Sequence, residues 1–279
     1  MPSPPQQSLR AITYLSPGIP LEFFEAITHY LGKVVGRVGQ LESDERISGP
    51  MHGEHDPFAA GRADLGFVCS PSFLYLRSLA TPSVELLPVG FVFDDARNQG
   101  RPHYFSDVIV RADRDVTQLD QLRDGVFGFN DTCSLSGYFA VRQELANQNK
   151  AEGFFSAERC TGSHAASIRA VLDGEIDVAA IDSNVLALAY RSTPDLRERL
   201  RVIESWGPHP IQPIVLSTRA AELMPTLTQA LLEIMDDAEF GPSLRRFGLA
   251  RCVPIDEDLY AEERAALIAL DELHEAPTG

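Results

Sequence analysis

The sequence is poor in positive charge. Its 24 Lys and Arg residues are outnumbered by 40 Asp and Glu residues, so the formal net charge is −16 at pH 7. Proteins that bind nucleic acids or anionic membranes rely on Lys and Arg to neutralise phosphate, so we expect neither partner. An anion site in this chain would have to use local donors, because the overall field repels anions.

Cysteine is also scarce. The four cysteines are Cys69, Cys133, Cys160 and Cys252, which lie far apart and form no CxxC pair. A structural zinc site needs closely spaced ligands, so we expect no metal, and no motif indicates a cofactor. The even count permits disulfides but does not imply them in a chain of 279 residues.

Long apolar runs are missing as well. No run approaches the ~20 residues of a membrane-spanning helix, so we expect no membrane insertion. Residues 1–7 are polar and lack the basic and apolar regions of a secretory signal. As written, the sequence predicts a soluble protein without an export signal, unless it is a mature form or its true start lies upstream.

What the chain does contain is an alternation of apolar strand patterns with helical ones. Hydrophobic residues make up 44% and charged residues 23%, as in globular proteins. Strands are predicted at 9–15, 34–41, 65–69, 84–93, 104–111, 126–130, 176–181, 200–204 and 214–217. Helices are predicted at 21–31, 57–64, 73–79, 119–122, 140–145, 164–172, 184–190, 223–238, 243–247 and 258–273. The alternation predicts an α/β fold with mixed, largely parallel sheets.

Two polar, turn-rich segments interrupt this alternation. The first is 94–102, and the second, 206–213, has three prolines in eight residues, which favours an end to regular structure. Two crossings with an inserted middle block would make a hinged pair of lobes with a cleft between them. The predicted crossings lie near 94–103 and 204–213, with lobe 1 formed by 1–97 and 208–279 and lobe 2 by 98–207.

One hydroxyl-rich stretch, 131–139, stands between a predicted strand and a predicted helix. It contains Ser134, Ser136 and Gly137. Backbone N–H groups, hydroxyl donors and the positive end of a helix dipole would together suit an oxyanion. The alternative is an ordinary helix cap, because Ser, Thr and Asp are favoured at that position.

Similar turns follow other predicted strands. They are 16–19, 70–72 with Ser70, 162–164 with His164, and 182–184 with Asp182 and Asn184. In open α/β sheets, ligands bind outside the carboxyl ends of the strands. Helix capping alone could explain any one of these turns, but it explains less well why all of them follow strands. Either His164 donates to an anion or it is a surface or capping histidine.

Aromatic residues and one cysteine are further candidates. The aromatic residues Tyr14, Tyr104, Tyr138 and Trp206 are candidates to line a cleft, with core packing as the alternative. Cys133 stands near a predicted helix start, where a thiol pKa is usually lowered, and would be a nucleophile with His164 as its base. Neither the spacing nor a known nucleophile signature supports that pairing.

Three segments carry a resemblance to a known family. They are 131–137 with its Ser-x-Ser-Gly core, Gly-Ser-His-Ala-Ala-Ser at 162–167 followed by 170–180, and 60–67 leading into Ser70-Pro71. In this order they resemble the phosphonate-binding proteins of ABC transporters, over roughly residues 8–260. The resemblance implies the type 2 periplasmic-binding-protein fold, in which two α/β lobes close around a ligand.

The resemblance also implies a site and a function. Ser134, Ser136, Gly137 and His164 would hold the oxygens of a phosphonate or phosphate, with Ser70 and Tyr104 near the cleft. The chain would capture a small phosphorus oxyanion or organophosphonate and deliver it to an ABC permease, without catalysis. By resemblance it would be periplasmic, but the chain as written has no signal peptide, so it would be cytoplasmic if its start is complete.

The chain departs from the family at one position of the site. Members that bind aminophosphonates have an acidic residue twenty positions beyond the histidine, where this chain has Asn184. Whether a ligand amine is recognised therefore stays open, with Asp182 as a substitute. Two other functions stay open as well: a cytosolic enzyme on the same fold, like those of the menaquinone pathway, and a ligand-sensing domain.

Overall fold

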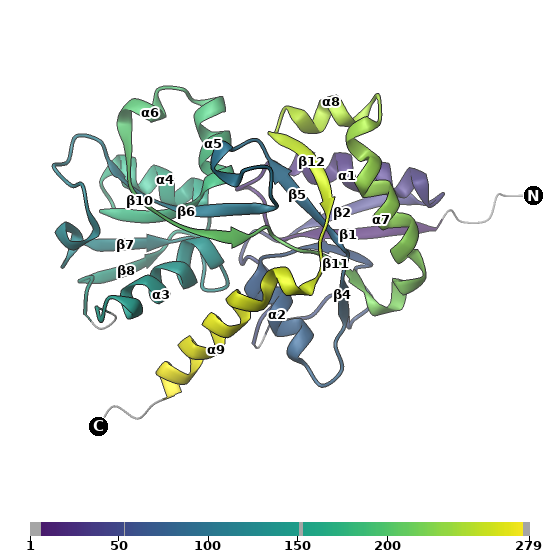
Figure 1. Cartoon of the computed structure of the whole chain (residues 1–279), viewed down its shortest axis with the longest axis horizontal. Coiled ribbons are helices and arrows are strands. Elements are labelled where there is room, and N and C mark those ends of the chain that lie inside the picture. The colour runs from purple at the N-terminus through teal and green to yellow at the C-terminus, as the bar shows by residue number, and fades with distance from the viewer. Residues whose placement is uncertain (1–6, 53, 151–152, 276–279) are drawn as a thin grey trace, which may run out of the picture. The chain divides into compact units, whose positions relative to one another are not determined.

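The structure is a computed structural model that describes residues 7–52, 54–150 and 153–275 (Figure 1). Its strands are β1 Ser8–Thr13, β2 Val38–Ser43, β3 Leu65–Phe67, β4 Val84–Leu86, β5 Val89–Phe93, β6 His103–Arg111, β7 Val126–Phe129, β8 Ala157–Cys160, β9 Val178–Asp182, β10 Leu200–Pro210, β11 Ile214–Ser217 and β12 Leu249–Pro254. Its α-helices are α1 Leu21–Val34, α2 Ser70–Ser78, α3 Ala140–Asn147, α4 His164–Asp173, α5 Ser183–Ser192, α6 Leu196–Arg199, α7 Met224–Glu233, α8 Phe240–Arg245 and α9 Ala261–Glu275. No helix among the described residues has the length and hydropathy that crossing a membrane requires.

Contacts divide the chain into two compact units. Unit 1 runs up to Pro102 and resumes over Ile211–Leu259, whereas unit 2 contains His103–Pro210 and the chain from Tyr260 on. The chain therefore passes between the units three times, where the sequence predicted two crossings. The correction concerns α9, which contacts α3 and belongs to unit 2 rather than to the lobe predicted for 208–279.

Unit 1 is built on a five-stranded sheet in the order β2-β1-β3-β11-β4. The strands β2, β1 and β3 are parallel, and β11 is antiparallel to both of its neighbours. Helix α1 packs on β1 and β2 and buries Phe24, Ile27 and Leu31, which recur at helical spacing. A second, antiparallel pair of strands joins β5 to β12.

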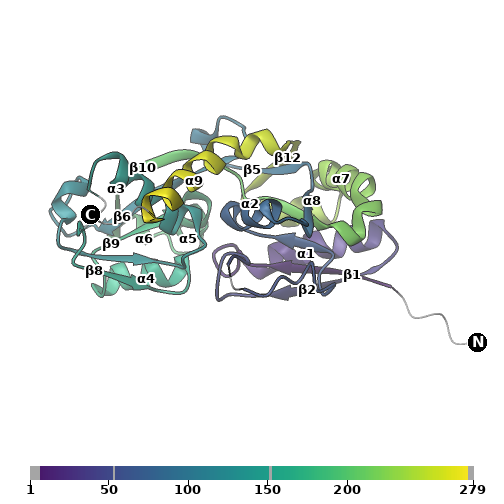
Figure 2. The ribbon, with the colours of Figure 1, turned by 90° about the horizontal axis from the view of Figure 1, so that it is seen from below.

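Unit 2 is built on a five-stranded sheet in the order β10-β6-β9-β7-β8. Alternate residues of a strand face opposite sides of a sheet. Val178 and Ala180 of β9 thus lie in one buried cluster with Val141 and Leu145 of α3, while α4 also packs on β9. Figure 2 shows α3 and α4 on opposite faces of this sheet.

Regular structure continues where the sequence predicted a break. Strand β10 runs to Pro210 instead of ending at residue 204. It is an edge strand, paired only with β6, and it is bulged between Trp206 and His209. Proline is tolerated at such positions, because an edge strand has one side on which a missing N–H costs no ladder hydrogen bond.

Other predicted elements were wrong in type or extent. The run 84–93 forms two strands of different sheets, β4 and β5, and 57–64 forms turns rather than a helix. Helix α1 extends to Val34, within the strand predicted at 34–41. Strands β8 and β12 were not predicted, because their side chains, apart from the buried Leu249, are partly or fully exposed and give no alternating apolar pattern.

Candidate functional site

One edge of the unit 2 sheet collects the polar turns that the sequence singled out. The strands β7, β8 and β9 are parallel, so their carboxyl ends lie at the same edge. Strand β6 is antiparallel to β9 and pairs Ser106 with Asp182, which brings the beginning of β6 to this edge too. The turns that follow β7, β8 and β9 carry Ser136, His164 and Asn184. This is where α/β sheets usually bind ligands.

The turn after β7 is a single turn of π-helix, Leu135–Phe139, that leads into α3. Ser134 caps it, since its Oγ accepts a hydrogen bond of 3.1 Å from the backbone N–H of Gly137. The preceding loop is tied by Asp131, whose carboxylate accepts from the Cys133 N–H and from the Asn130 amide, both at 2.8 Å. Single π turns inside helices are frequent at functional sites.

Ser136 joins three elements of unit 2. Its backbone oxygen accepts a hydrogen bond of 2.7 Å from Ser106 Oγ on β6. Its own Oγ lies 3.3 Å from Nε2 of His164, the first residue of α4. The structure therefore brings together two of the residues predicted to hold an oxyanion, from segments 28 residues apart.

Gly137 has no room for a side chain. A Cβ at this position would lie 1.8 Å from Asn130 Oδ1 and 3.1 Å from His164 Cε1. The absence of a side chain lets the Asn130 amide and the His164 imidazole approach the backbone. The N–H of Gly137 is bonded to Ser134, so these two residues form a cap, as the alternative interpretation of this stretch proposed.

His164 is electrically neutral in this environment. Burial lowers the pKa of its imidazole to about 4, and no carboxylate opposes this shift. Its Nδ1 is buried and has no hydrogen-bond partner among the described residues. A buried polar atom without a partner is costly, so the ring is poised to bond with a group that supplies one.

The turn after β9 separates the roles of Asp182 and Asn184. The carboxylate of Asp182 caps α5 by accepting from the N–H groups of Asn184 and Val185, at 2.7 and 3.3 Å. The side chain of Asn184 is buried, and its Nδ2 has no partner among the described residues. The unmatched group at this position is therefore a neutral donor.

Two aromatic candidates of unit 2 are packed rather than open. Tyr104 is fully buried, and its ring centroid lies 5.6 Å from that of His209. Trp206 packs against the buried cluster on the α3 side of the sheet, and its indole N–H donates to Glu204 Oε2 at 2.9 Å. Tyr104 therefore has the core position that the alternative interpretation predicted, whereas Trp206 is only partly buried.

The two candidates in unit 1 also follow parallel strands. Tyr14 follows β1, and burial is the main cause that raises the pKa of its phenol. Ser70 begins α2 after β3, and its buried Oγ has no partner among the described residues. Since β1 and β3 are parallel, both residues stand at the carboxyl edge of the unit 1 sheet.

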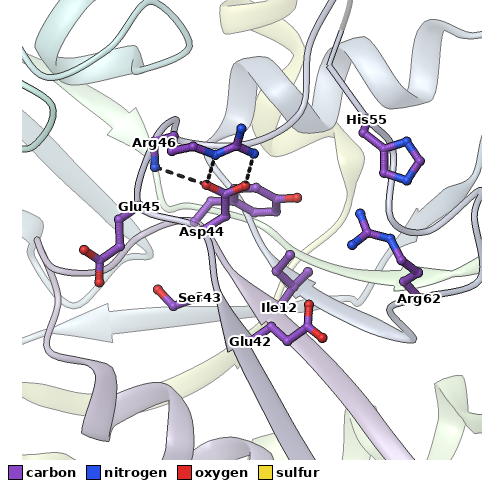
Figure 3. A pocket seen from close by; sticks show the side chains of 9 residues that line it. Ile12, Glu42, Ser43, Asp44, Glu45, Arg46, His55 and Arg62 are labelled. Atoms are coloured by element: carbon purple, nitrogen blue, oxygen red, sulfur yellow. Dashed lines mark hydrogen bonds and ion pairs between the residues drawn. The ribbon is translucent and has the colours of Figure 1, made fainter.

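A pocket of about 460 Å³ opens at this edge of unit 1 (Figure 3). It is lined by Ile12, Tyr14, Glu42, Ser43, Asp44, Glu45, Arg46, His55 and Arg62. Asp44 and Arg46 form a two-pronged ion pair, with Nε–Oδ1 and Nη2–Oδ2 distances of 2.9 and 2.6 Å. The hydrogen bonds from Arg46 lower the pKa of the Asp44 carboxyl.

A comparison with models of protein families shows to which family the chain belongs. The model of the family described as "ABC transporter, phosphonate, periplasmic substrate-binding protein" matches residues 14–260. The chain belongs to this family. It is therefore a solute-binding protein of the kind that serves ABC transporters, a family that is periplasmic in those systems. A comparison with curated proteins finds no match.

Solved structures of other proteins have the same fold. A binding protein component of an ABC phosphonate transporter from Pseudomonas aeruginosa is 18% identical, with a TM-score of 0.79 over 98% of this chain and 91% of that one. PhnD1 from Prochlorococcus marinus, in complex with methylphosphonate, is 16% identical, with a TM-score of 0.75 over 95% and 98%. A Xanthomonas citri protein bound to ATP is 20% identical, with a TM-score of 0.69 over 95% and 98%.

Sequence patterns did not single out several residues of the unit 2 site and of the unit 1 pocket of this binding protein. Ser106 and Asn130 hold the unit 2 site, but they lie in or directly after apolar strands and carry no motif of their own. Arg62 lies in a segment predicted to be a helix, and Glu42 lies at the end of a strand. A polar residue at a strand's carboxyl end was the available signal for Glu42. The described residues hold no cluster of His, Cys, Asp or Glu fit to bind a metal.

Proposed function

We propose that the chain captures a small phosphorus oxyanion or organophosphonate at the carboxyl edge of the unit 2 sheet. The observation that carries the proposal is the meeting of Ser136 Oγ and His164 Nε2 at 3.3 Å, beside Gly137, whose missing side chain lets the His164 ring approach the backbone. A hydroxyl and an imidazole supply hydrogen bonds without positive charge. Such neutral donors, together with the start of α4, suit an oxyanion in a protein whose net charge is −16.

Unsatisfied atoms support this assignment. Nδ1 of His164 and Nδ2 of Asn184 are both buried and lack partners among the described residues. A ligand with several oxygens and at least one proton or acceptor would satisfy them and recover the free energy that they cost. The ligand would be delivered to an ABC permease, and the chain would act outside the cytoplasmic membrane without covalent catalysis.

Isothermal titration calorimetry with phosphate, phosphite and methylphosphonate tests the proposal. At least one ligand should bind with micromolar affinity or better, and the double variant Ser136→Ala, His164→Ala should lose the signal. A matched control is Ser192→Ala, because this serine on α5 bonds only to its own helix. Heat from none of the three ligands, with a folded protein, would contradict the proposed function.

A further inference from the structure

Ser136 and His164 form a pair whose donors and acceptors can be counted. A neutral imidazole carries one proton on its two nitrogens, and a hydroxyl carries one proton as well. Because Ser136 Oγ and His164 Nε2 lie 3.3 Å apart, one of these two protons joins them and the other is left to donate outward. In one tautomer Oγ donates outward and Nδ1 accepts, and in the other Nδ1 donates and Oγ accepts. Both tautomers give the pair one outward donor and one outward acceptor.

The turn that carries Asn184 is connected to this pair through β6. Ser106 of β6 is the register partner of Asp182, and its Oγ donates to the backbone oxygen of Ser136 at 2.7 Å. Asn184, two residues after Asp182, has a buried Nδ2 with no partner among the described residues. Together with the pair, this amide gives the edge at least two outward donors and at least one outward acceptor.

The charges of the turns favour a ligand with one negative charge over a ligand with two. The turns 130–137, 160–164 and 182–184 contain no Lys or Arg and have two acidic residues, Asp131 and Asp182. Both are buried and accept hydrogen bonds from backbone N–H groups, which favours the charged form of a carboxyl. Because repulsion is stronger in a low dielectric, a second negative charge on the ligand is disfavoured at this edge.

We propose that the unit 2 site selects the singly protonated, monoanionic form of its phosphorus ligand, whose P–OH group donates to the acceptor end of the Ser136–His164 pair. The two unprotonated oxygens then accept from the donor end of the pair and from Asn184. A dianion lacks this proton, and so does a sulfonate, so each leaves a buried acceptor without a partner. The inference rests on the proposed function and adds to it the ionisation state of the ligand.

Calorimetry of the full chain with phosphite and methylphosphonate over a range of pH tests the inference. The second pKa values of these ligands differ, and phosphorus NMR measures each in the same buffer. Above that pKa the fraction of monoanion falls about tenfold per pH unit, so the affinity should fall equally steeply from each ligand's own second pKa. Binding above it should take up about one proton per ligand, measured from the dependence of the binding enthalpy on the buffer.

The comparison of two ligands separates titration of the ligand from titration of the protein. A titrating side chain would make both affinities fall from one shared pH, whereas the inference predicts two different pH values. The titratable and charged side chains on the elements around the pair are Tyr104 and Asp107 on β6, Asp131, Cys133 and Tyr138 after β7, Cys160 on β8, Asp182 on β9, and Tyr190 and Arg191 on α5. A shared pH, or affinities that do not depend on pH, would overturn the inference.

A sulfonate and two carboxylate variants test the proton and the charge separately. Methanesulfonate resembles the methylphosphonate monoanion in shape and charge but has no proton, so it should bind at least about tenfold more weakly. Asp182→Asn keeps an oxygen to cap α5 but removes a charge, and should tighten methylphosphonate binding above its second pKa by about threefold. The matched control is Asp113→Asn, which removes an exposed carboxylate beyond the end of β6, at the opposite edge of the sheet. Equal binding of the sulfonate, or two variants that behave alike, would overturn the inference.

Nitrogen NMR of the His164 ring locates the proton in the complex. A neutral imidazole in the bound state supports the inference, whereas an imidazolium would mean that the ligand binds as a dianion and would overturn it. Failure of the proposed function has a different signature, because then neither phosphorus ligand binds at any pH and both proposals fall. Binding without a fall in affinity above the ligand's second pKa refutes only the choice of ionisation state.

Discussion

Replacing Gly137 with alanine should disrupt the unit 2 site, because the added Cβ atom would collide with neighbouring side chains. The added Cβ would lie 1.8 Å from Asn130 Oδ1, where ordinary contact needs about 3.4 Å, so the amide must move by roughly 1.5 Å. That movement breaks the 2.8 Å hydrogen bond from Asn130 to Asp131. It also presses on the His164 ring, whose Cε1 would be 3.1 Å away.

The expected cost has two parts. Overpacking a buried site costs about 1–3 kcal/mol, and losing a buried hydrogen bond costs about 0.5–1.5 kcal/mol. We therefore expect Gly137→Ala to lower the free energy of unfolding by about 2–4 kcal/mol and to weaken methylphosphonate binding at least tenfold. Urea denaturation and calorimetry measure the two effects.

Two further variants show whether the clash with Asn130 is the cause. In Gly36→Ala a Cβ meets nothing within 4 Å, although φ is +67°, so we expect a cost of about 1 kcal/mol from the backbone alone and unchanged binding. Asn130→Ala removes the atom that is struck, so the double variant with Gly137→Ala should cost less than the sum of the single variants. Additive costs, or a stable Gly137→Ala variant with normal binding, would refute this reasoning.

Two other predictions concern stability. Burial lowers the pKa of His164 and His209 to about 4, below the ~6.5 of an unfolded chain, so the unfolded state binds more protons between these pH values. The free energy of unfolding should be at its full value above pH ~6.5 and should fall toward pH ~4 by up to about 3 kcal/mol for each histidine. If the free energy of unfolding of a His164→Gln, His209→Gln variant fell equally steeply with pH, this explanation would be wrong. Arg10→Ala should cost about 1–2 kcal/mol in urea denaturation, because it removes the guanidinium that bonds both carboxylate oxygens of the buried Asp64. Lys33→Ala, at an exposed pair, should cost under about 0.5 kcal/mol.

The sequence was most informative where a chemical pattern and a strand end coincide. The Ser-x-Ser-Gly and Gly-Ser-His segments predicted that Ser136 and His164 share a site, and the structure brings their side chains together. The α/β class followed from alternating apolar runs, and family membership confirms the two-lobed fold type. Which of these residues touch a ligand stays a prediction.

The remaining features depend on contacts that a sequence pattern does not encode. All four residues of the edge strand β8 are exposed, so no apolar alternation marks it. The prolines at the end of the edge strand β10 are typical of a linker, so its full length was not predicted. The placement of α9 with α3 is set by long-range packing. Arg62 was not singled out because no sequence pattern distinguishes an arginine that lines a pocket from one on the outer surface.

The most direct test of the central claim is the NMR signal of the His164 ring during titration with methylphosphonate. The account predicts that the Cε1–H resonance shifts and saturates with the dissociation constant measured by calorimetry, and that both signals weaken together in Ser136→Ala. Calorimetric binding that leaves the His164 resonance unmoved would contradict the account, because the oxyanion would then lie elsewhere.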